Sequence, residues 1–416
     1  MYRLLRFFLL IFNFSFLTVF TQVPHPRAIN VPQSILSGIK KSPSKYFPDL
    51  TAHLMKGVSS PEEKVRIFHD WIALNIEYDV EGYFSGQVEA YEELDVLRTG
   101  KSVCQGYANV FAAMCNAAGI ENIIITGYGR GLGFSIFGGE EKYNSNHAWN
   151  AVKLSGRWRL IDATWDAGYV DGREFIRRYS TAYFMPDPAE FIYSHFPENN
   201  KYQFLPSPLS FDEFRKQPFL REGFFEMRLE FAEKYNLVEK CGSEKILSLN
   251  VPSGVNMLAS LYNNKGKEIS GRTFVQKRDG KINIYVRFPS QGEYELILFA
   301  SDKGAAEKYD GVANLKLIAS EGNDYGFPVV YSDMAASGAV ILEPLINPLK
   351  ADSETEFKIF SKNDIVPGIY AGGSFIELKN DGAGNYSIKV KVPRGEVVLC
   401  RKDGDRLSYL CKWDSR

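Results

Sequence analysis

A change of pattern near Phe224 constrains the fold more than any other feature of this sequence. After it, short apolar runs such as Ile282–Phe288 and Tyr294–Ala300 alternate with turn signals, among them Asp279-Gly280 and Gln291-Gly292. Before it, apolar residues recur at helical spacing. A helical region followed by strands and then by a strand-only tail indicates an α+β domain with all-β modules behind it.

The tail shows the strand-and-turn pattern twice, over 224–320 and 325–416. We predict two short β-sandwich modules of roughly 90 residues each. Cys400 and Cys411 lie in the second module. A tight turn at Asp403-Gly404 would set Leu407 opposite Cys400, so a disulfide between the two cysteines requires a longer loop, and the sequence leaves this pairing open.

The first half carries recognisable helix boundaries. Ser60-Pro61-Glu62-Glu63 predicts a helix start, with Ser60 as the cap, and the helical spacing runs on to Tyr78-Asp79. Ser102 is the expected cap of a later helix over 103–118. The remaining expectations are a loose leader over 22–59, a helix over 87–98, a strand over 123–126 and a mobile, lid-like loop over 127–146.

Two strands, His147–Leu154 and Trp158–Trp165, are joined by Ser155-Gly156. If these two residues form the turn, the numbers of facing residues sum to 311, and Asp162 becomes the diagonal neighbour of His147 on one face. Diagonal Cβ atoms lie roughly 7 Å apart, within reach of a hydrogen bond between the side chains.

Cys104 stands at the predicted start of the 103–118 helix, where the helix dipole stabilises a thiolate. A carboxylate on His147 would fix the imidazole tautomer and leave the second ring nitrogen for a nucleophile. Cys104, His147 and Asp162 together suit thiol acyl transfer. We expect the Cys104 N–H to be one oxyanion donor, with a second donor somewhere upstream. Cys115 lies about 16 Å further along the helix and is expected in the core.

Three motifs now point to a family: Val103-Cys104-Gln105-Gly106-Tyr107-Ala108, Asn146-His147-Ala148-Trp149-Asn150, and Trp158 to Trp165 ending in Asp162-Ala163-Thr164-Trp165. Together they resemble the transglutaminase-like superfamily. The aromatic segments from Tyr183 to Pro197 and from Phe211 to Pro218 look like the extension of its kyphoscoliosis-peptidase-like branch.

The resemblance implies a papain-like, transglutaminase-like α+β core over 60–220, followed by two Ig-like modules. It also implies a Cys104–His147–Asp162 catalytic triad. We further expect Trp149, Gln105 and Tyr107 to line the substrate groove. No cofactor and no metal is expected, because none of the five His residues is spaced as a metal-binding pair.

The leading hypothesis is therefore a thiol enzyme that acts on amide bonds of a protein or peptide, as a peptidase or amidase. The alternatives are a cross-linking transglutaminase, in which an amine replaces water, and a non-catalytic scaffold with a relic triad. An intact triad argues against the scaffold.

The N-terminus and the charge balance bear on location and partners. Two Arg residues precede the uncharged apolar run Phe7–Phe20, which predicts a signal peptide over 1–21, with an uncleaved anchor as the alternative. The protein is then expected to be secreted, periplasmic or at the cell surface, where the sandwich modules would bind a cell-surface or cell-wall partner. A formal net charge of −1 argues against nucleic-acid binding.

Overall fold

A computed structural model describes residues 23–132, 134–138, 144–302 and 308–416 of the protein. The chain divides into two compact units. Unit 1 comprises the chain up to Thr126 and His147–Pro186, and unit 2 comprises Gly127–Asn146 and Asp187–Arg416. Residues 187–220, which we expected to extend the α+β domain, group with the strand-rich tail.

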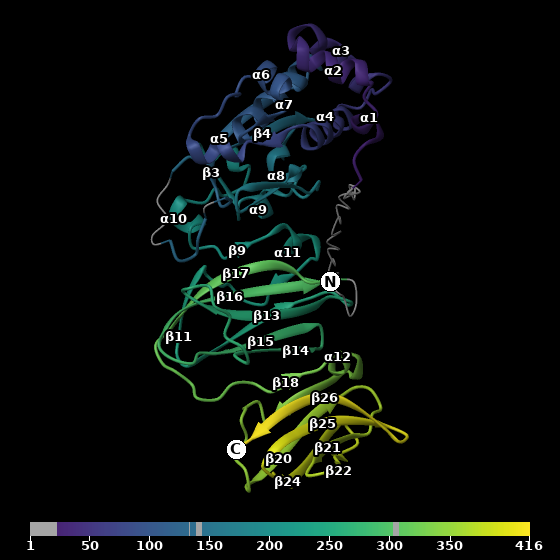
Figure 1. Ribbon diagram of the computed structural model, residues 1–416, viewed down its shortest axis with the longest axis vertical. Coiled ribbons are helices and arrows are strands. Elements are labelled where there is room, and N and C mark those ends of the chain that lie inside the picture. Colours follow the sequence, from purple (N-terminus) through teal and green to yellow (C-terminus); the bar gives the residue numbers. More distant parts are fainter. Residues whose placement is uncertain (1–22, 133, 139–143, 303–307) are drawn as a thin grey trace, which may run out of the picture. The chain divides into compact units, whose positions relative to one another are not determined.

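The helices of unit 1 are α1 (Pro26–Ile29), α2 (Gln33–Lys41), α3 (Pro43–Met55), α4 (Pro61–Asn75), α5 (Val80–Ser85), α6 (Glu93–Thr99), α7 (Cys104–Ala117) and α8 (Ala163–Ala167) (Figure 1). Helix α4 begins as predicted, because Ser60 Oγ accepts the N–H of Glu63 at 3.2 Å. It ends at Asn75 rather than near Asp79, because Tyr78 enters a strand and Asp79 caps α5.

Residues 23–59 form helices α1, α2 and α3 and not the loose leader that we expected. Ile39, Leu50 and Leu54 are buried in the same core as the apolar side chains of α4 and α7. We had predicted a loop there because the segment contains several prolines. Pro26 and Pro43 occupy the first turns of their helices, where a missing N–H costs nothing.

The main strands of unit 1 are β3 (Asn122–Gly129), β4 (His147–Leu154) and β5 (Arg157–Ile161), in the order β5-β4-β3. Unit 1 also contains two short strand pairs: β1 (Glu77–Tyr78) with β2 (Lys101–Ser102), and β6 (Gly168–Asp171) with β7 (Glu174–Arg177). The β4–β5 register is the predicted one, with Asn150 opposite Ile161 and Leu154 opposite Arg157. Ser155 and Gly156 have positive φ angles of 48° and 76°, as a two-residue hairpin turn requires. Strand β5 stops at Ile161 and does not reach Trp165.

The first part of unit 2 is held together by Arg130. The last residues of β3 pair there with β8 (His195–Pro197), near α9 (Pro188–Phe191), η1 (Asn200–Gln203) and α10 (Phe211–Phe214). Arg130 is 1% exposed, and its guanidinium donates to the carbonyls of Tyr193, Phe214 and Gln217 at 3.0–3.3 Å. The expected mobile loop is therefore ordered over 127–130, while residues 133 and 139–143 of that loop lie outside the described residues.

The first β-sandwich follows. Its elements are β9 (Phe219–Leu220), α11 (Glu222–Glu226), β10 (Glu230–Phe231), β11 (Val238–Cys241), β12 (Glu244–Asn250), β13 (Asn256–Asn263), β14 (Thr273–Arg278), β15 (Lys281–Arg287), β16 (Gly292–Ser301) and β17 (Asp310–Ala319). They form sheets ordered β10-β12-β15-β14 and β11-β17-β16-β13. Leu247, Ile284, Leu296 and Leu315 lie in the core of this sandwich and are fully buried.

The second β-sandwich contains β18 (Val329–Val330), α12 (Asp333–Ser337), β19 (Ala339–Glu343), β20 (Glu354–Ser361), β21 (Pro367–Ala371), β22 (Ser374–Glu377), β23 (Lys379–Asn380), β24 (Asn385–Lys391), β25 (Gly395–Asp403) and β26 (Arg406–Ser415). Its sheets run β18-β26-β25-β21-β22 and β19-β20-β24-β23. Cys400 and Cys411 are both buried and both free. A register shift after Leu399 places Tyr409, not Leu407, opposite Cys400.

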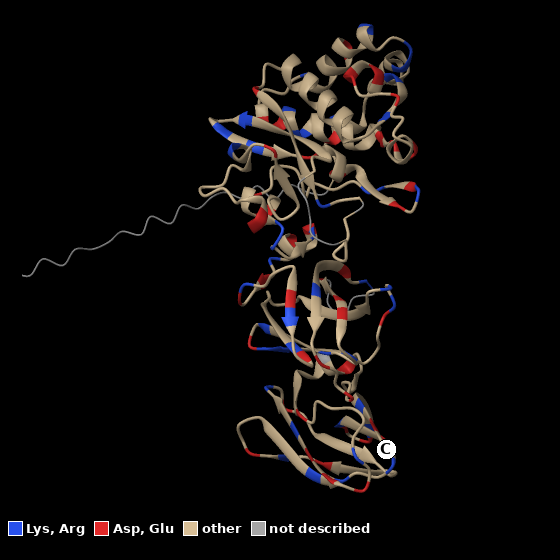
Figure 2. Cartoon of the chain, turned by 90° about the vertical axis from the view of Figure 1, so that its left-hand side faces the viewer, with Lys and Arg blue, Asp and Glu red and all other residues tan. Residues whose placement is uncertain are grey.

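Figure 2 shows basic and acidic residues interspersed on the strands of the sandwiches. Several form ion pairs between adjacent strands, such as Lys316 with Glu293 at 2.9 Å and Lys412 with Glu396 at 2.8 Å. Both pairs are diagonal neighbours on adjacent strands, and opposite charges at such positions stabilise a sheet modestly.

The apolar N-terminal run lies outside the described residues. Among the residues that the structure does describe, no helix has the length and apolar character needed to cross a membrane.

The packing of α3 generates a stability prediction. Leu50→Ala is expected to lower the free energy of unfolding by about 2–5 kcal/mol, because it opens a cavity in the core of unit 1. Asp49→Ala, an exposed neighbour on the same helix, should change it by less than about 0.5 kcal/mol. Chemical denaturation measures both. Equal effects of the two changes would show that α3 is not part of the core.

Candidate active site

Cys104 is the first residue of α7, as predicted from the sequence, but the expected cap is wrong. The helix is capped by Val103 without a side-chain hydrogen bond. Ser102 is fully buried and donates instead to the carbonyl of Ala90, because the chain just before α6 lies against this point. Gly106 allows the close approach of α7, since a Cβ there would collide with the Ser102 side chain. The first turn of α7 therefore presents Cys104 at the positive end of the helix dipole.

His147 and Asp162 lie in contact. The Nε2 atom of His147, the first residue of β4, is 2.6 Å from Oδ2 of Asp162. Asp162 is not in a strand, as we had expected, but is the N-cap of α8, where its Oδ1 accepts the N–H groups of Thr164 at 2.8 Å and Trp165 at 3.2 Å. Asp is a strong N-cap, and this local preference ends β5 at Ile161, the residue before Asp162. The cap fixes the carboxylate with its second oxygen facing His147.

Cys104 completes the arrangement. Its thiol is hydrogen-bonded to the His147 side chain and to the N–H of Ala148. Because His147 Nε2 contacts Asp162, the other ring nitrogen, Nδ1, is the one available to Cys104. The structure thus brings the three residues of the predicted triad together within unit 1.

The charges of the three groups support one another. Burial raises the pKa of the Cys104 thiol, but the imidazolium of His147 and its hydrogen bonds lower it more, so that this pKa lies below its ordinary value. Burial lowers the pKa of His147, while the charges of Asp162 and Cys104 raise it to about 10. Both shifts favour a thiolate–imidazolium pair beside the Asp162 carboxylate.

Two indole rings lie beside the imidazole. The ring centroid of His147 is 5.8 Å from that of Trp149 and 5.2 Å from that of Trp165. Trp165 in turn contacts Tyr183 edge-on at 5.1 Å. These rings limit the orientations open to the imidazole. From the sequence we placed Trp165 at the end of a strand and missed its place beside His147.

The expected groove residues Trp149 and Tyr107 do not line an open groove. Each is 1% exposed, and the Tyr107 hydroxyl donates to the carbonyl of Ile76 at 2.8 Å. Both face inward because β4 and α7 pack against each other, which their residue types alone do not show. Gln105 is half-buried, and its amide donates to Asn109 on the next helical turn at 2.9 Å.

Tyr78 also belongs to this neighbourhood and was missed. It lies opposite Ser102 in the parallel pairing of β1 with β2, and Ser102 precedes Cys104 by two residues. Burial raises the pKa of its phenol, and the nearby charge of Cys104 raises it further. The Tyr78 hydroxyl therefore keeps its proton throughout the neutral range.

Comparison with known proteins agrees with this geometry. Residues 48–163 match the model of the transglutaminase-like superfamily, and residues 211–329 match that of the KY-like, immunoglobulin-like domain. The chain therefore combines a transglutaminase-like domain with a KY-like, immunoglobulin-like domain. These matches confirm the predicted fold class.

The chain is similar to kyphoscoliosis peptidase over 65% of its length, with 34% identity to the Mus musculus protein and 32% to the Homo sapiens protein. It is 26% identical to Hillarin of Drosophila melanogaster over 69% of its length. It covers 40% of each kyphoscoliosis peptidase and 39% of Hillarin, so it spans about two fifths of these relatives. The expected kinship with the kyphoscoliosis-peptidase-like branch is confirmed.

The ion pair predicts an unusual pH profile for alkylation of Cys104. An ordinary thiol of pKa ~8.5 is less than about 1% ionised at pH 6. We expect the iodoacetamide rate of Cys104 to reach its plateau at a lower pH than that of an ordinary thiol, because its pKa is lowered, and to change again only as His147 deprotonates near pH 10. Mass mapping of the labelled peptide measures this rate. Cys241 is the internal reference, since it is free, only partly buried, and has a pKa raised by burial. A Cys104 rate that climbs tenfold per pH unit up to pH 8 would contradict the ion pair.

Proposed function

We propose that this protein is a thiol enzyme that cleaves amide bonds in a protein or peptide, as a peptidase or amidase. The observation that carries the proposal is the contact of one imidazole with both a thiol at a helix N-terminus and a buried carboxylate. This arrangement supplies a nucleophile, a proton carrier and a group that orients the carrier.

The steps follow from the resting charges. The Cys104 thiolate attacks the amide carbonyl carbon, and the C–O π electrons move onto oxygen. When the tetrahedral intermediate collapses, the C–N bond breaks and His147 gives its proton to the leaving nitrogen. A thioester remains on Cys104. Neutral His147 then takes a proton from water, the hydroxide oxygen attacks the thioester, and the C–S bond breaks to restore the thiolate and release the acid.

The oxyanion formed in this reaction requires hydrogen-bond donors. The Cys104 N–H belongs to the unpaired N–H groups of the first turn of α7. We assign the second, upstream donor to the protonated hydroxyl of Tyr78, on the support of its pairing opposite Ser102 and its electrostatic proximity to Cys104.

An amine in place of water would make the same thioester a cross-linking intermediate, and the match to the transglutaminase-like superfamily favours this second candidate. A fluorescent casein substrate, with and without a fluorescent primary amine, separates the two reactions. Small fluorescent fragments support hydrolysis, and amine incorporated into intact casein supports transfer.

Location and partner are part of the proposal. The basic residues and apolar run at the N-terminus support export, and two sandwich modules without any His support a binding role on a cell-surface or cell-wall partner.

Cys104→Ala is expected to abolish both hydrolysis and amine transfer while changing the free energy of unfolding by only about 1 kcal/mol or less. Asp162→Asn keeps a side-chain oxygen to cap α8 but removes the negative charge that faces His147. Turnover should therefore fall by about 10⁴-fold. Steady-state hydrolysis and thermal unfolding measure the two effects. Full activity in Cys104→Ala would rule out the proposed mechanism.

Tyr78→Phe tests the assigned oxyanion donor. We expect turnover to fall by about 10²–10³-fold, as when one oxyanion donor is lost. Alkylation of Cys104 by iodoacetamide forms no oxyanion and should proceed at the wild-type rate. Tyr83→Phe, an exposed tyrosine on α5, is the matched control and should leave both rates unchanged. Equal turnover in the two variants would remove Tyr78 from the mechanism.

A further inference from the structure

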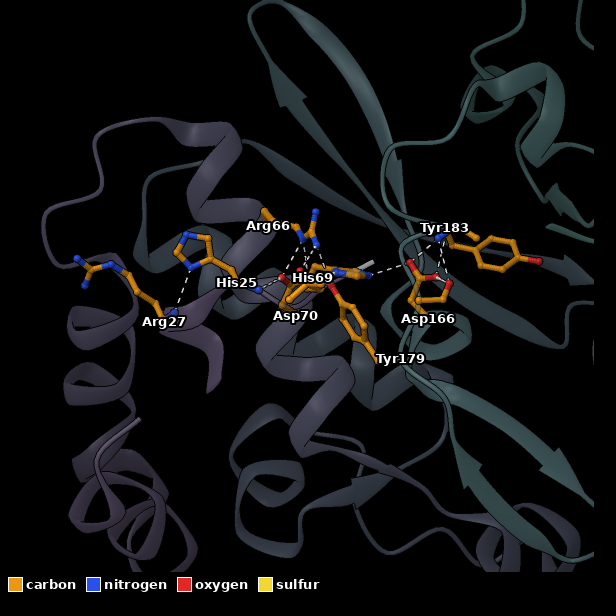
Figure 3. A network of polar contacts seen from close by, with 11 residues as sticks. His25, Arg27, Arg66, His69, Asp70, Asp166, Tyr179 and Tyr183 are labelled. Atoms are coloured by element: carbon orange, nitrogen blue, oxygen red, sulfur yellow. Dashed lines mark hydrogen bonds and ion pairs between the residues drawn. The ribbon is translucent and has the colours of Figure 1, made fainter. Parts of the chain in front are cut away.

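A second histidine of unit 1 lies between two carboxylates, away from solvent. His69, in α4, has Nδ1 2.8 Å from Oδ1 of Asp70 and Nε2 2.9 Å from Oδ2 of Asp166 in α8 (Figure 3). All three side chains are fully buried. Arg66 and the Tyr179 hydroxyl also donate to Asp70, at 2.8 Å and 2.7 Å, and the backbone N–H of His25 donates to it at 2.7 Å.

The geometry requires His69 to be charged. A neutral imidazole has one N–H, and its other nitrogen would face a carboxylate with no proton between them. Protonated His69 and Arg66 together balance the two carboxylates, so the cluster is neutral as a whole. Burial lowers the pKa of His69, but the hydrogen bonds to Asp166 and Asp70 raise it to about 9.

A continuous set of hydrogen bonds leads from this cluster to the active site. The Asp166 carboxylate accepts the N–H of Tyr183 at 3.1 Å, and the carbonyl of Tyr183 accepts the N–H of Asp162 at 3.0 Å. Asp166 also donates its own N–H to the carbonyl of Asp162 at 3.3 Å, within α8. Asp162 is the residue that contacts His147. Both sides of the Asp162 backbone are therefore held by groups that depend on Asp166.

We propose that His69 is a positioning residue for the thiol site: by holding Asp166 it fixes the turn of α8 and the Tyr183 peptide, and so aims the Asp162 carboxylate at His147. The proposal rests on the proposed function, because it concerns the same Cys104–His147–Asp162 site. His69 touches none of the reacting atoms and acts through Asp166, Tyr183 and Asp162 in turn.

The consequence is measurable at Cys104. When Asp162 is poorly aimed, His147 loses part of the charge that keeps it protonated, and the thiolate loses its partner. In His69→Gln and Asp166→Asn we expect the midpoint of the iodoacetamide pH profile to rise by one pH unit or more. At any pH below the wild-type midpoint, the labelling rate would then fall by about tenfold or more, since there each pH unit changes the thiolate fraction tenfold.

Two further variants separate positioning from general loosening. Val65→Ala removes a fully buried apolar side chain from α4 without touching the hydrogen-bonded set, and it should leave the Cys104 profile in place while lowering the melting temperature. Ser180→Ala removes a single hydroxyl that contacts Asp166 and keeps every charge of the cluster, so a smaller shift in the same direction is expected.

The outcomes decide as follows. Shifted profiles in His69→Gln and Asp166→Asn with an unshifted Val65→Ala support the proposal. Folded His69→Gln and Asp166→Asn proteins with the wild-type profile, or an equal shift in Val65→Ala, overturn it. If neither polar variant folds, Ser180→Ala decides alone by the presence or absence of a shift. Full hydrolysis by Cys104→Ala would refute the proposed function itself, which is a separate result.

Discussion

The contact between His147 and Asp162 is the interaction on which the candidate active site depends. Burial by itself raises the pKa of the Cys104 thiol and lowers that of the imidazole, so each group alone would be neutral. The Asp162 carboxylate outweighs burial at His147 and raises the pKa of the imidazole. The imidazolium then outweighs burial at Cys104 and lowers the pKa of the thiol. A low-dielectric site can hold the resulting charges because each has a partner of opposite sign within hydrogen-bond distance.

Asp162 has two structural duties, and they are coupled. One carboxylate oxygen caps α8 and the other contacts His147. An acid that caps a helix has its χ angles set by the N–H groups it accepts, so its free oxygen is aimed without additional packing. The same residue type at the end of a longer strand would have kept its rotamer freedom. The departure from the predicted strand is therefore what makes the carboxylate a rigid partner.

Local rules predicted the parts of the site that are set by local chemistry. The Ser155-Gly156 turn predicted the β4–β5 register. The helix start next to Cys104 was predicted through Ser102 as the cap; the start is observed, although the cap is Val103. Local rules failed where one residue has two competing local preferences, and where the packing of distant elements sets the burial of a side chain. Ser102 could cap a helix or bond a distant carbonyl, and Asp162 could extend a strand or cap a helix. Trp149 and Tyr107 have polar edges that suit a groove, but the contact of α7 with β4 buries them. The prolines of 23–59 are typical of a loop, yet also of first helical turns.

The buried cluster around His69 shows why the sequence could not reveal the whole site. Its side chains come from α4, from α8 and from the segment after β7, and two of them, Arg66 and Tyr179, are 113 residues apart along the chain. No spacing rule joins them, because only the folded core brings α4 against α8. Within that core, two buried histidines each contact a carboxylate, and one backbone segment, Asp162–Asp166, supplies a carboxylate to each. The short helix α8 therefore carries an anion at both ends, and the charge on either histidine stabilises the position of the same turn. The geometry of the candidate site therefore depends on two buried histidine–carboxylate pairs rather than on Cys104, His147 and Asp162 alone.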